Sequence, residues 1–398
     1  MHAVQVLYLL CPPGPVELTA EEEAALAGEE GEALQTAYRI LLATGEATDA
    51  ERLVPVEWAH VSGVNYNTIG DTGEEFLAEL SRSARVRTKT TLNPMGYDSE
   101  SPGGHGVTAE FARRQESIKE SYARLGVEPS FSCIPYEIYE LPPEGTRVAF
   151  AESNAAIYAN SVAGLNTNKE SAFSALASAL TGKTTYAGPP PGPDAAVHMG
   201  IKDPDEVAFG LMGFFAGKLA DGAVAISGAG SPDTRCTKSL CAGLGTSGTC
   251  SRYELGEGQG LERVDFGREE MQSVHDELST AEGGDVITLA SPQLGLGELG
   301  ELSAMLAGRR FGKMCMVFCP RAAQNKARRL GYAATIERAG CEILSDCCTC
   351  LTPLISRDDV DSVITNSVKG AYYLKNSNRV GVDLRPLSEI IKQETERG

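Results

Sequence analysis

Three cysteines crowd into one short segment, since residues 346–350 read Asp-Cys-Cys-Thr-Cys. Thiolates held close together on a loop at the end of a strand can bind zinc or an iron–sulfur cluster. The spacing is neither that of a zinc ribbon nor that of a ferredoxin, and core cysteines remain the alternative. Ligands from distant segments would have to complete a metal site, and Cys133 and Cys319, each near a proline, are the best candidates.

A second group of cysteines, Cys236, Cys241 and Cys250, surrounds the glycine-rich residues 243–248. Their spacing leaves a metal site open here too. The chain has 11 cysteines, a high number for a cytosolic protein, in which stable disulfides are uncommon. We therefore expect some of them to be metal ligands and others to be small apolar core residues.

Polar runs rich in Asn, Ser and Thr recur in the first half of the chain. Each can cap a helix or close a turn by itself. Together they offer amide, hydroxyl and helix N-terminal donors of the kind that hold carboxylate or phosphate oxygens, with Lys169 adding positive charge. The residues expected to bind substrate are Gly63, Val64, Asn65, Thr91, Asn93, Glu152, Ser153, Asn154, Asn160, Ser161, Asn168 and Lys169.

The formal net charge of −19 repels nucleic acid and anionic membrane surfaces, so neither is an expected partner. No segment approaches about 18 uninterrupted apolar residues, which predicts a cytoplasmic protein without a membrane span. A small anionic substrate would need local positive groups, backbone N–H donors or a metal to overcome the surrounding negative charge.

In the C-terminal part, strand and helix patterns alternate, and these elements must position the candidate ligands Cys319 and 346–350. Strands are expected at 285–289, 313–318 and 342–344, with helices at 297–307 and 322–339. This order predicts an open parallel sheet covered by helices, in which ligands sit beyond the carboxyl ends of the strands. Cys319 follows one of these strands and residues 346–350 follow another.

The first half predicts further helices and a strand that leads into a polar loop. A capping box at Thr19 and Glu22 opens a helical region towards residue 42, and residues 53–64 read as a strand ending in a loop. Further helices are expected at 73–82, 108–125 with Gly126 as the stop, 169–180 with Asn168 as the cap, and 204–219. We expect an N-terminal extension over residues 1–16 and three regions, 17–190, 191–284 and 285–398.

At these residues the chain resembles aconitase X, a branch of the aconitase superfamily, from about residue 16 to the C-terminal helix. The matching segments are residues 61–73, 90–98, 132–137, 151–182, 345–353 and 365–371, and the run 152–168 is especially specific. The resemblance implies an α/β, aconitase-like multi-domain architecture with parallel or mixed sheets flanked by helices, here without the small swivelling domain of the family.

The resemblance also implies an iron–sulfur cluster, [4Fe–4S] in type, held by three cysteines with one iron open to substrate oxygen. Cys133 and Cys348 match family positions, and Cys319 is the expected third ligand. Residues 319–321 read Cys-Pro-Arg where the family more often has a Thr-Ser-Arg-like segment. Residues 291–293 read Ser-Pro-Gln where Cys- or Ser-Pro-His is common, so Ser291 is an alternative ligand.

Members of the family are hydro-lyases that either carry the swivelling domain or pair with it as a small subunit, which contributes a catalytic serine. We expect the second arrangement here. Archaeal members dehydrate the phosphorylated hydroxy acid mevalonate 5-phosphate to trans-anhydromevalonate 5-phosphate in the mevalonate pathway, and bacterial members dehydrate cis-3-hydroxy-L-proline. The cysteine-rich, acidic chain favours the former. A non-catalytic iron–sulfur or zinc scaffold is the alternative from another class.

Overall fold

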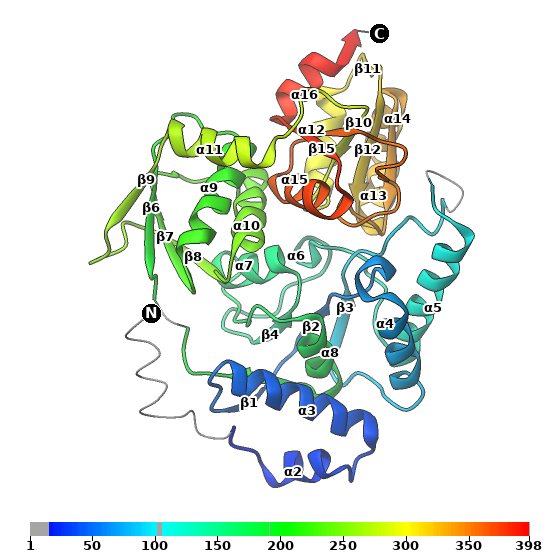
Figure 1. Cartoon of the computed structure of the whole chain (residues 1–398), viewed down its shortest axis with the longest axis vertical. Helices are drawn as coiled ribbons and strands as arrows, with labels where there is room; N and C mark the ends of the chain where they lie inside the picture. The colour runs from blue at the N-terminus through cyan, green and yellow to red at the C-terminus, as the bar shows by residue number, and fades with distance from the viewer. Residues whose placement is uncertain (1–15, 102–105, 191, 398) are drawn as a thin grey trace.

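A five-stranded parallel sheet forms the C-terminal part of the molecule (Figure 1). The structure is a computed structural model that describes residues 16–101, 106–190 and 192–397. In spatial order the strands are β13 (Cys341–Ser345), β12 (Met314–Cys319), β10 (Val286–Leu289), β14 (Ser362–Thr365) and β15 (Gly381–Leu384). The accompanying elements are α12 (Leu296–Met305), β11 (Arg309–Phe311), α13 (Arg321–Arg329), α14 (Tyr332–Arg338), α15 (Val368–Tyr373), η1 (Leu374–Asn378), α16 (Leu387–Glu394) and β16 (Thr395–Arg397).

A four-stranded parallel sheet forms the middle of the chain. Its elements are β8 (Arg252–Leu255), β7 (Ala223–Ser227), β6 (Ala195–Met199), β9 (Arg263–Phe266), α9 (Glu206–Leu219), α10 (Thr234–Ser247) and α11 (Arg268–Leu278). Helices α9 and α10 approach very closely, because a Cβ added at Gly243 would lie 2.1 Å from the carbonyl oxygen of Gly210. Only glycine permits such contact between backbones.

A three-stranded parallel sheet and an antiparallel pair organise the N-terminal part. Its strands are β1 (Arg52–Pro55), β2 (Trp58–Val61), β3 (Lys89–Leu92), β4 (Val148–Phe150) and β5 (Lys183–Tyr186). Its helices are α2 (Ala20–Ala27), α3 (Glu32–Ala47), α4 (Tyr66–Leu80), α5 (Ala109–Leu125), α6 (Pro135–Ile138), α7 (Ser153–Ser161) and α8 (Ala172–Thr181). Strand β2 is central, with β3 and β4 on its two sides.

The structure confirms the α/β architecture and several local predictions. Thr19 and Glu22 form the capping box of α2. Helix α5 begins after its cap Thr108 and ends at Gly126, which has the left-handed φ of +86° that favours glycine. The β–α order of the C-terminal part and its parallel sheet are also as predicted.

Other boundaries were wrong. The N-cap of α8 is Ser171 and not Asn168, because residues 166 and 169 form extended bridges with residues 147 and 150 beside β4. The single helix predicted at 322–339 is broken at Gly331, whose φ is +81°. The predicted strand at 53–64 is two strands, and α4 begins at Tyr66. The predicted extension lies outside the described residues except for Val16.

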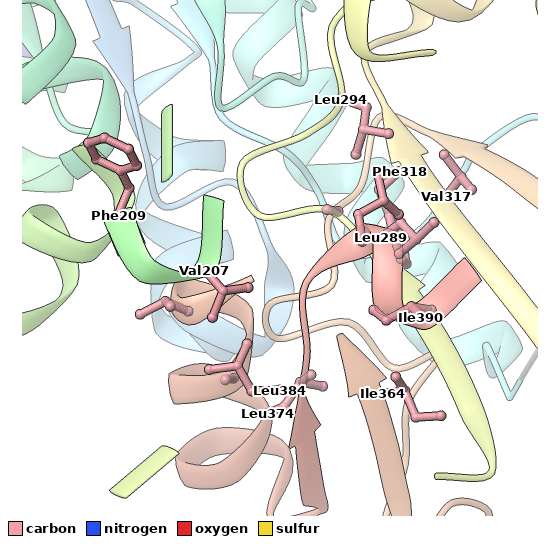
Figure 2. Close-up of a cluster of buried hydrophobic side chains, with 14 of the residues drawn as sticks. Val207, Phe209, Leu289, Leu294, Val317, Phe318, Ile364, Leu374, Leu384 and Ile390 are labelled. Carbon is pink, nitrogen blue, oxygen red and sulfur yellow. The ribbon is translucent and has the colours of Figure 1, made fainter. Parts of the chain in front are cut away.

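A continuous apolar cluster joins the middle and C-terminal parts. Figure 2 shows Val207 and Phe209 of α9 in the same group as Leu289 of β10, Phe318 of β12 and Ile390 of α16. Burying such side chains contributes roughly 1.5–3 kcal/mol each, which holds the two parts together. Within the described residues, no helix is long and apolar enough to cross a membrane.

Candidate active site

A cavity of about 710 Å³ opens beyond the carboxyl ends of strands from two sheets. Loops after β2, β3 and β4 supply part of its wall, and segments after β10, β13 and β14 supply another part. Ligand sites form at such edges because successive loops converge there. The lining residues are Ser62, Gly63, Val64, Asn65, Thr68, Ile69, Thr72, Gly73, Phe76, Leu77, Asn93, Pro94, Tyr122, Cys133, Ala151, Glu152, Ser153, Ala172, Phe173, Leu176, Gly245, Ser291, Cys348, Cys350, Leu351, Lys369 and Tyr373.

Three cysteines line this cavity, namely Cys133, Cys348 and Cys350. The main-chain N–H of Gln293 donates to Sγ of Cys133 at 3.1 Å, and Sγ of Cys350 lies 2.9 Å from the hydroxyl of Ser291. Hydrogen bonds from Cys133 and Cys350 hold the pKa of the Cys348 thiol well below its usual value, because they stabilise its charged form. The thiolate is the form that binds metals.

These sulfurs fit an iron–sulfur cluster by the chemistry of the donor set. They are soft ligands from two distant segments, and one of them already accepts a backbone N–H. In the part of the chain that the structure describes, no group of three His, Cys, Asp or Glu side chains is arranged around a metal position. The thiols are hydrogen-bonded to one another, so cluster binding would require them to lose their protons.

The structure does not bring the expected third ligand, Cys319, to the cavity. This residue ends β12, is fully buried, and places Sγ 3.8 Å from the hydroxyl of Ser345 on β13. Burial raises the pKa of the Cys319 thiol to about 12. Cys350 lines the cavity where a third ligand was expected, and the alternative Ser291 lines it as well.

The second group of cysteines belongs to the protein core. Cys236, Cys241 and Cys250 all pack in the large hydrophobic cluster of the middle and C-terminal parts. Burial raises the pKa of the Cys241 thiol, and Sγ of Cys250 donates to the carbonyl oxygen of Arg252 at 3.2 Å. Their packing agrees with the interpretation of these residues as small apolar side chains.

Lys369 is the only Lys or Arg among the described residues that line the cavity. Its ammonium forms an ion pair with Glu152 Oε1 and donates to Asn154 Oδ1 at 3.3 Å. Burial by itself lowers the pKa of Lys369, but the negative charge of Glu152 raises it overall. An ammonium has three N–H groups, so these two contacts leave one for a ligand.

Glu152 links this ammonium to the polar loop after β3. Its Oε2 accepts from Asn93 Nδ2 at 2.7 Å, and Asn154 Nδ2 donates to the carbonyl oxygen of Cys133 at 3.0 Å. The cysteines and the ion pair therefore belong to one hydrogen-bonded wall.

Strained backbone surrounds this wall. Non-glycine residues with positive φ include Phe131 at +41°, Ser291 at +68°, Asp346 at +63° and Leu351 at +61°. Such conformations are costly for bulky side chains and persist only where the surrounding structure imposes them, which is common at functional sites.

Eight of the residues predicted from sequence lie on the cavity wall. They are Gly63, Val64, Asn65, Asn93, Cys133, Glu152, Ser153 and Cys348. Two others, Thr91 and Asn154, lie behind the wall and contact His60 and Lys369, respectively.

The remaining predicted residues have structural contacts away from the cavity. Asn160 donates to the carbonyls of Thr167 and Ser251, and Ser161 accepts from the main chain of Tyr253. Asn168 donates to the carbonyl oxygen of Thr185 at 2.9 Å.

Lys169 donates to the carbonyl oxygen of Gly248 at 2.5 Å, just after the end of α10. A cation in this position compensates the negative end of the helix dipole. The prediction that Lys169 lies at the start of a helix was wrong because α8 begins later, at Ala172.

The sequence prediction missed Lys369 although segment 365–371 carried the resemblance. A signal was present, because a lysine that closely follows a buried strand falls at the carboxyl edge of a parallel sheet. Cys350 was recognised within its cysteine-rich segment but not selected as a ligand. Tyr373 and the aromatic residue Phe173 at the cavity wall had no distinctive local pattern.

Comparisons with known proteins match most of the chain to one family. The family model described as Aconitase X first domain matches residues 15–190, that of the second domain matches residues 193–276, and that of the third domain matches residues 284–396. The crystal structure of aconitase X from Thermococcus kodakaraensis in its holo-form is similar, with a TM-score of 0.86 and 30% sequence identity. That alignment covers 95% of this chain and 100% of the other.

Curated relatives carry two names. The phosphomevalonate dehydratase large subunit of Methanocaldococcus jannaschii is 31% identical, over 94% of this chain and 99% of the relative. The protein of the same name from Methanothermobacter thermautotrophicus is 34% identical, over 87% and 90%. Cis-3-hydroxy-L-proline dehydratase of Pseudomonas aeruginosa is 31% identical, over 90% of this chain but 66% of the relative.

Proposed function

Because this chain belongs to the aconitase X family, we propose that it is the large subunit of a phosphomevalonate dehydratase, a hydro-lyase that acts with a small subunit. The observation that carries the proposal is the cavity wall on which three cysteines adjoin the Lys369–Glu152 ion pair. Two relatives named for this reaction align over 94% and 87% of this chain, and the alignments cover 99% and 90% of those relatives.

The ion pair supports an anionic substrate. A phosphorylated hydroxy acid carries a carboxylate and a phosphate, and the remaining N–H of Lys369 can donate to one of these groups. Glu152 keeps the ammonium charged and in place. The rest of the substrate charge would be offset by hydroxyl and backbone N–H donors, by the cofactor and by the partner subunit, because the cavity wall supplies no second Lys or Arg among the described residues.

We propose that Cys133, Cys348 and Cys350 hold an iron–sulfur cluster of the [4Fe–4S] type, with Ser291 beside Cys350. When bound, a cluster with an open iron supplies a Lewis acid that polarises the leaving hydroxyl. The chain's own residues would orient the substrate: Lys369 fixes an anionic end, and Glu152 keeps unused carboxylate lone pairs at the cavity.

A small subunit would complete the site. The cavity is open to solvent at Thr72 and at Phe173, a residue that is 59% exposed. Covering this side would exclude water, strengthen the interaction of Lys369 with the substrate, and add the serine expected from the family resemblance.

The function is tested by anaerobic co-purification with the small subunit, followed by NMR detection of dehydration. Conversion of mevalonate 5-phosphate to its anhydro product is the expected result. Turnover of cis-3-hydroxy-L-proline alone would replace the proposed substrate. A complex that contains iron and sulfide but dehydrates neither compound would favour a non-catalytic scaffold.

The ligand assignment is tested by a matched pair of serine variants. Cys350→Ser is expected to lower iron and sulfide content, whereas Cys319→Ser, which changes a thiol outside the cavity, should leave both near the wild-type values. Loss of iron from Cys319→Ser with retention in Cys350→Ser would return the assignment to Cys319. Ser291→Ala shows whether the neighbouring hydroxyl contributes.

A further inference from the structure

A buried histidine lies directly behind the cavity wall. His60 is fully buried at the centre of β2, where it is paired in register with Thr91 of β3 and Phe150 of β4. Its Nδ1 lies 2.7 Å from Thr91 Oγ1, and its Nε2 lies 2.9 Å from Asn93 Oδ1. None of the roles described for the cavity wall uses this side chain.

We propose that His60, as the neutral tautomer with hydrogen on Nε2, is a positioning residue that holds the Glu152 carboxylate at the cavity wall through the amide of Asn93. The inference rests on the proposed function only for its effect on turnover. The tautomer and the position of Glu152 follow from the hydrogen bonds that run from Lys369 through Glu152 and Asn93 to His60, which also has a backbone hydrogen bond with Ser132.

A chain of hydrogen bonds runs from Trp58 through Thr91, His60 and Asn93 to Glu152. Its donor-to-acceptor direction is set at its two ends. Lys369 can only donate, and it forms an ion pair with the Glu152 carboxylate, which accepts. The group that faces Glu152 Oε2 at 2.7 Å must therefore be the amide nitrogen of Asn93. This orientation turns Asn93 Oδ1 towards His60, and Nε2 of His60 must carry the hydrogen.

The other end agrees with this direction. The indole Nε1–H of Trp58 can only donate, and it donates to Thr91 Oγ1 at 2.8 Å. The hydroxyl hydrogen of Thr91 is then free to point to Nδ1 of His60, which accepts. Every donor from Trp58 to Glu152 thus has an acceptor.

The opposite tautomer would break the chain. A hydrogen on Nδ1 would leave Nε2 as an acceptor and would require the Asn93 amide to flip. The Asn93 oxygen would then face Glu152 Oε2 at 2.7 Å, and two acceptors at that distance repel each other. If Asn93 did not flip, two acceptors would instead face each other at His60, which has no exposed surface that water could reach. A correctly protonated His60 therefore fixes Asn93, and Asn93 fixes Glu152.

The test uses two substitutions that each keep one half of the imidazole. In His60→Asn, the amide falls near the position of Nδ1, so the contact with Thr91 can persist while the donor to Asn93 is lost. In His60→Gln, the longer side chain places an N–H near the position of Nε2 and can restore that donor. His198→Asn is the matched control, because His198 contacts Ser227 in a different sheet.

Two measurements on the complex with cluster and small subunit need no substrate. Nitrogen-15 NMR of histidine-labelled protein is expected to show His60 neutral with hydrogen on Nε2. A hydrogen on Nδ1, or a charged ring, would overturn the proposal. Crystal structures should show the Glu152 carboxylate displaced in His60→Asn and retained in His60→Gln, and an unmoved carboxylate in His60→Asn would also overturn it.

Turnover then reports the functional consequence. We expect kcat to fall by about tenfold or more in His60→Asn and to stay within about threefold of wild type in His60→Gln, with His198→Asn unchanged. Equal loss in both His60 variants would mean a general packing role. If the wild-type complex dehydrates no tested substrate, the proposed function fails, while the NMR and crystallographic results still decide the role of His60.

Discussion

Two buried lysines of this protein have different roles. One holds three elements together through ion pairs, and the other lines the cavity. Lys238 of α10 forms ion pairs with Glu137 at 2.8 Å and with Glu298, and it donates to the carbonyl oxygen of Gln293 at 2.9 Å. All three N–H groups of its ammonium are therefore used.

Lys369 has a different balance of contacts. Its ammonium has Glu152 and Asn154 as acceptors and lines the cavity, so one donor remains for a ligand. Burial alone does not identify a functional lysine. The number of unused donors, and the space that they face, distinguishes a binding group from a structural one.

The largest expected effect is on stability, and it comes from removing the ion pairs of Lys238. Lys238→Met would leave the carboxylates of Glu137 and Glu298, whose side chains are only 23% and 16% exposed, without their cation, and the carbonyl oxygen of Gln293 without its donor. We expect this to lower the free energy of unfolding by about 3–5 kcal/mol. Denaturant titration measures the loss. Lys238→Met combined with Glu137→Gln and Glu298→Gln should recover part of it, and a single variant as stable as wild type would contradict this account.

The next largest effect is on activity, and it comes from replacing the cavity lysine, Lys369. Lys369→Met is expected to lower kcat/KM by roughly 10²–10³-fold, because a fixed charge in a water-poor site is lost. Steady-state assays of the complex measure the change. The matched control is Lys326→Met on the exposed face of α13, and comparable losses in both variants would show that the cavity has no special need for Lys369.

The dependence of stability on pH tests whether the fold keeps His60 neutral while Glu152 and Lys369 are charged. Burial lowers the pKa of His60 to about 4, from a usual value of 6.5. Between these values the unfolded chain binds the extra proton and the folded chain does not, so stability falls as pH decreases from 6.5 towards 4. The expected loss is roughly 3 kcal/mol.

Denaturant titrations at several pH values measure this slope, and His60→Gln supplies the reference because glutamine does not titrate. The difference in unfolding free energy between wild type and His60→Gln should change with pH only over this window. A pH-independent difference would show that His60 is not kept neutral by the fold.

The smallest expected effect concerns a third lysine, Lys169, which lies outside the cavity. Lys169→Met removes a cation beside the end of α10, which we expect to cost about 0.3–1 kcal/mol of stability and to leave kcat unchanged. Thermal unfolding and the same turnover assay measure both quantities. A large loss of activity would mean that Lys169 reaches the substrate after all.

The local sequence predicted features that depend on neighbouring residues. The capping box at Thr19, the cap at Thr108 and the stop at Gly126 were all correct, because each satisfies backbone groups within one helical turn. The β–α alternation of the C-terminal part likewise predicted a parallel sheet. Cys133, Cys348, Asn93 and Glu152 were predicted at the site from residue type and resemblance, and the structure places all four on one cavity wall.

The tertiary structure decided which side chains point into that cavity. Cys319 and Cys350 both follow the pattern of a thiol at a strand end, yet one packs against Ser345 and the other lines the cavity. Lys169 and Lys369 diverge in the same way, as one caps a distant helix and the other contacts Glu152. Sequence alone determined the type and order of most elements and the donor types, because these depend on short-range backbone chemistry. The direction of each side chain depended on contacts between residues far apart in the chain, which only the packed structure brings together.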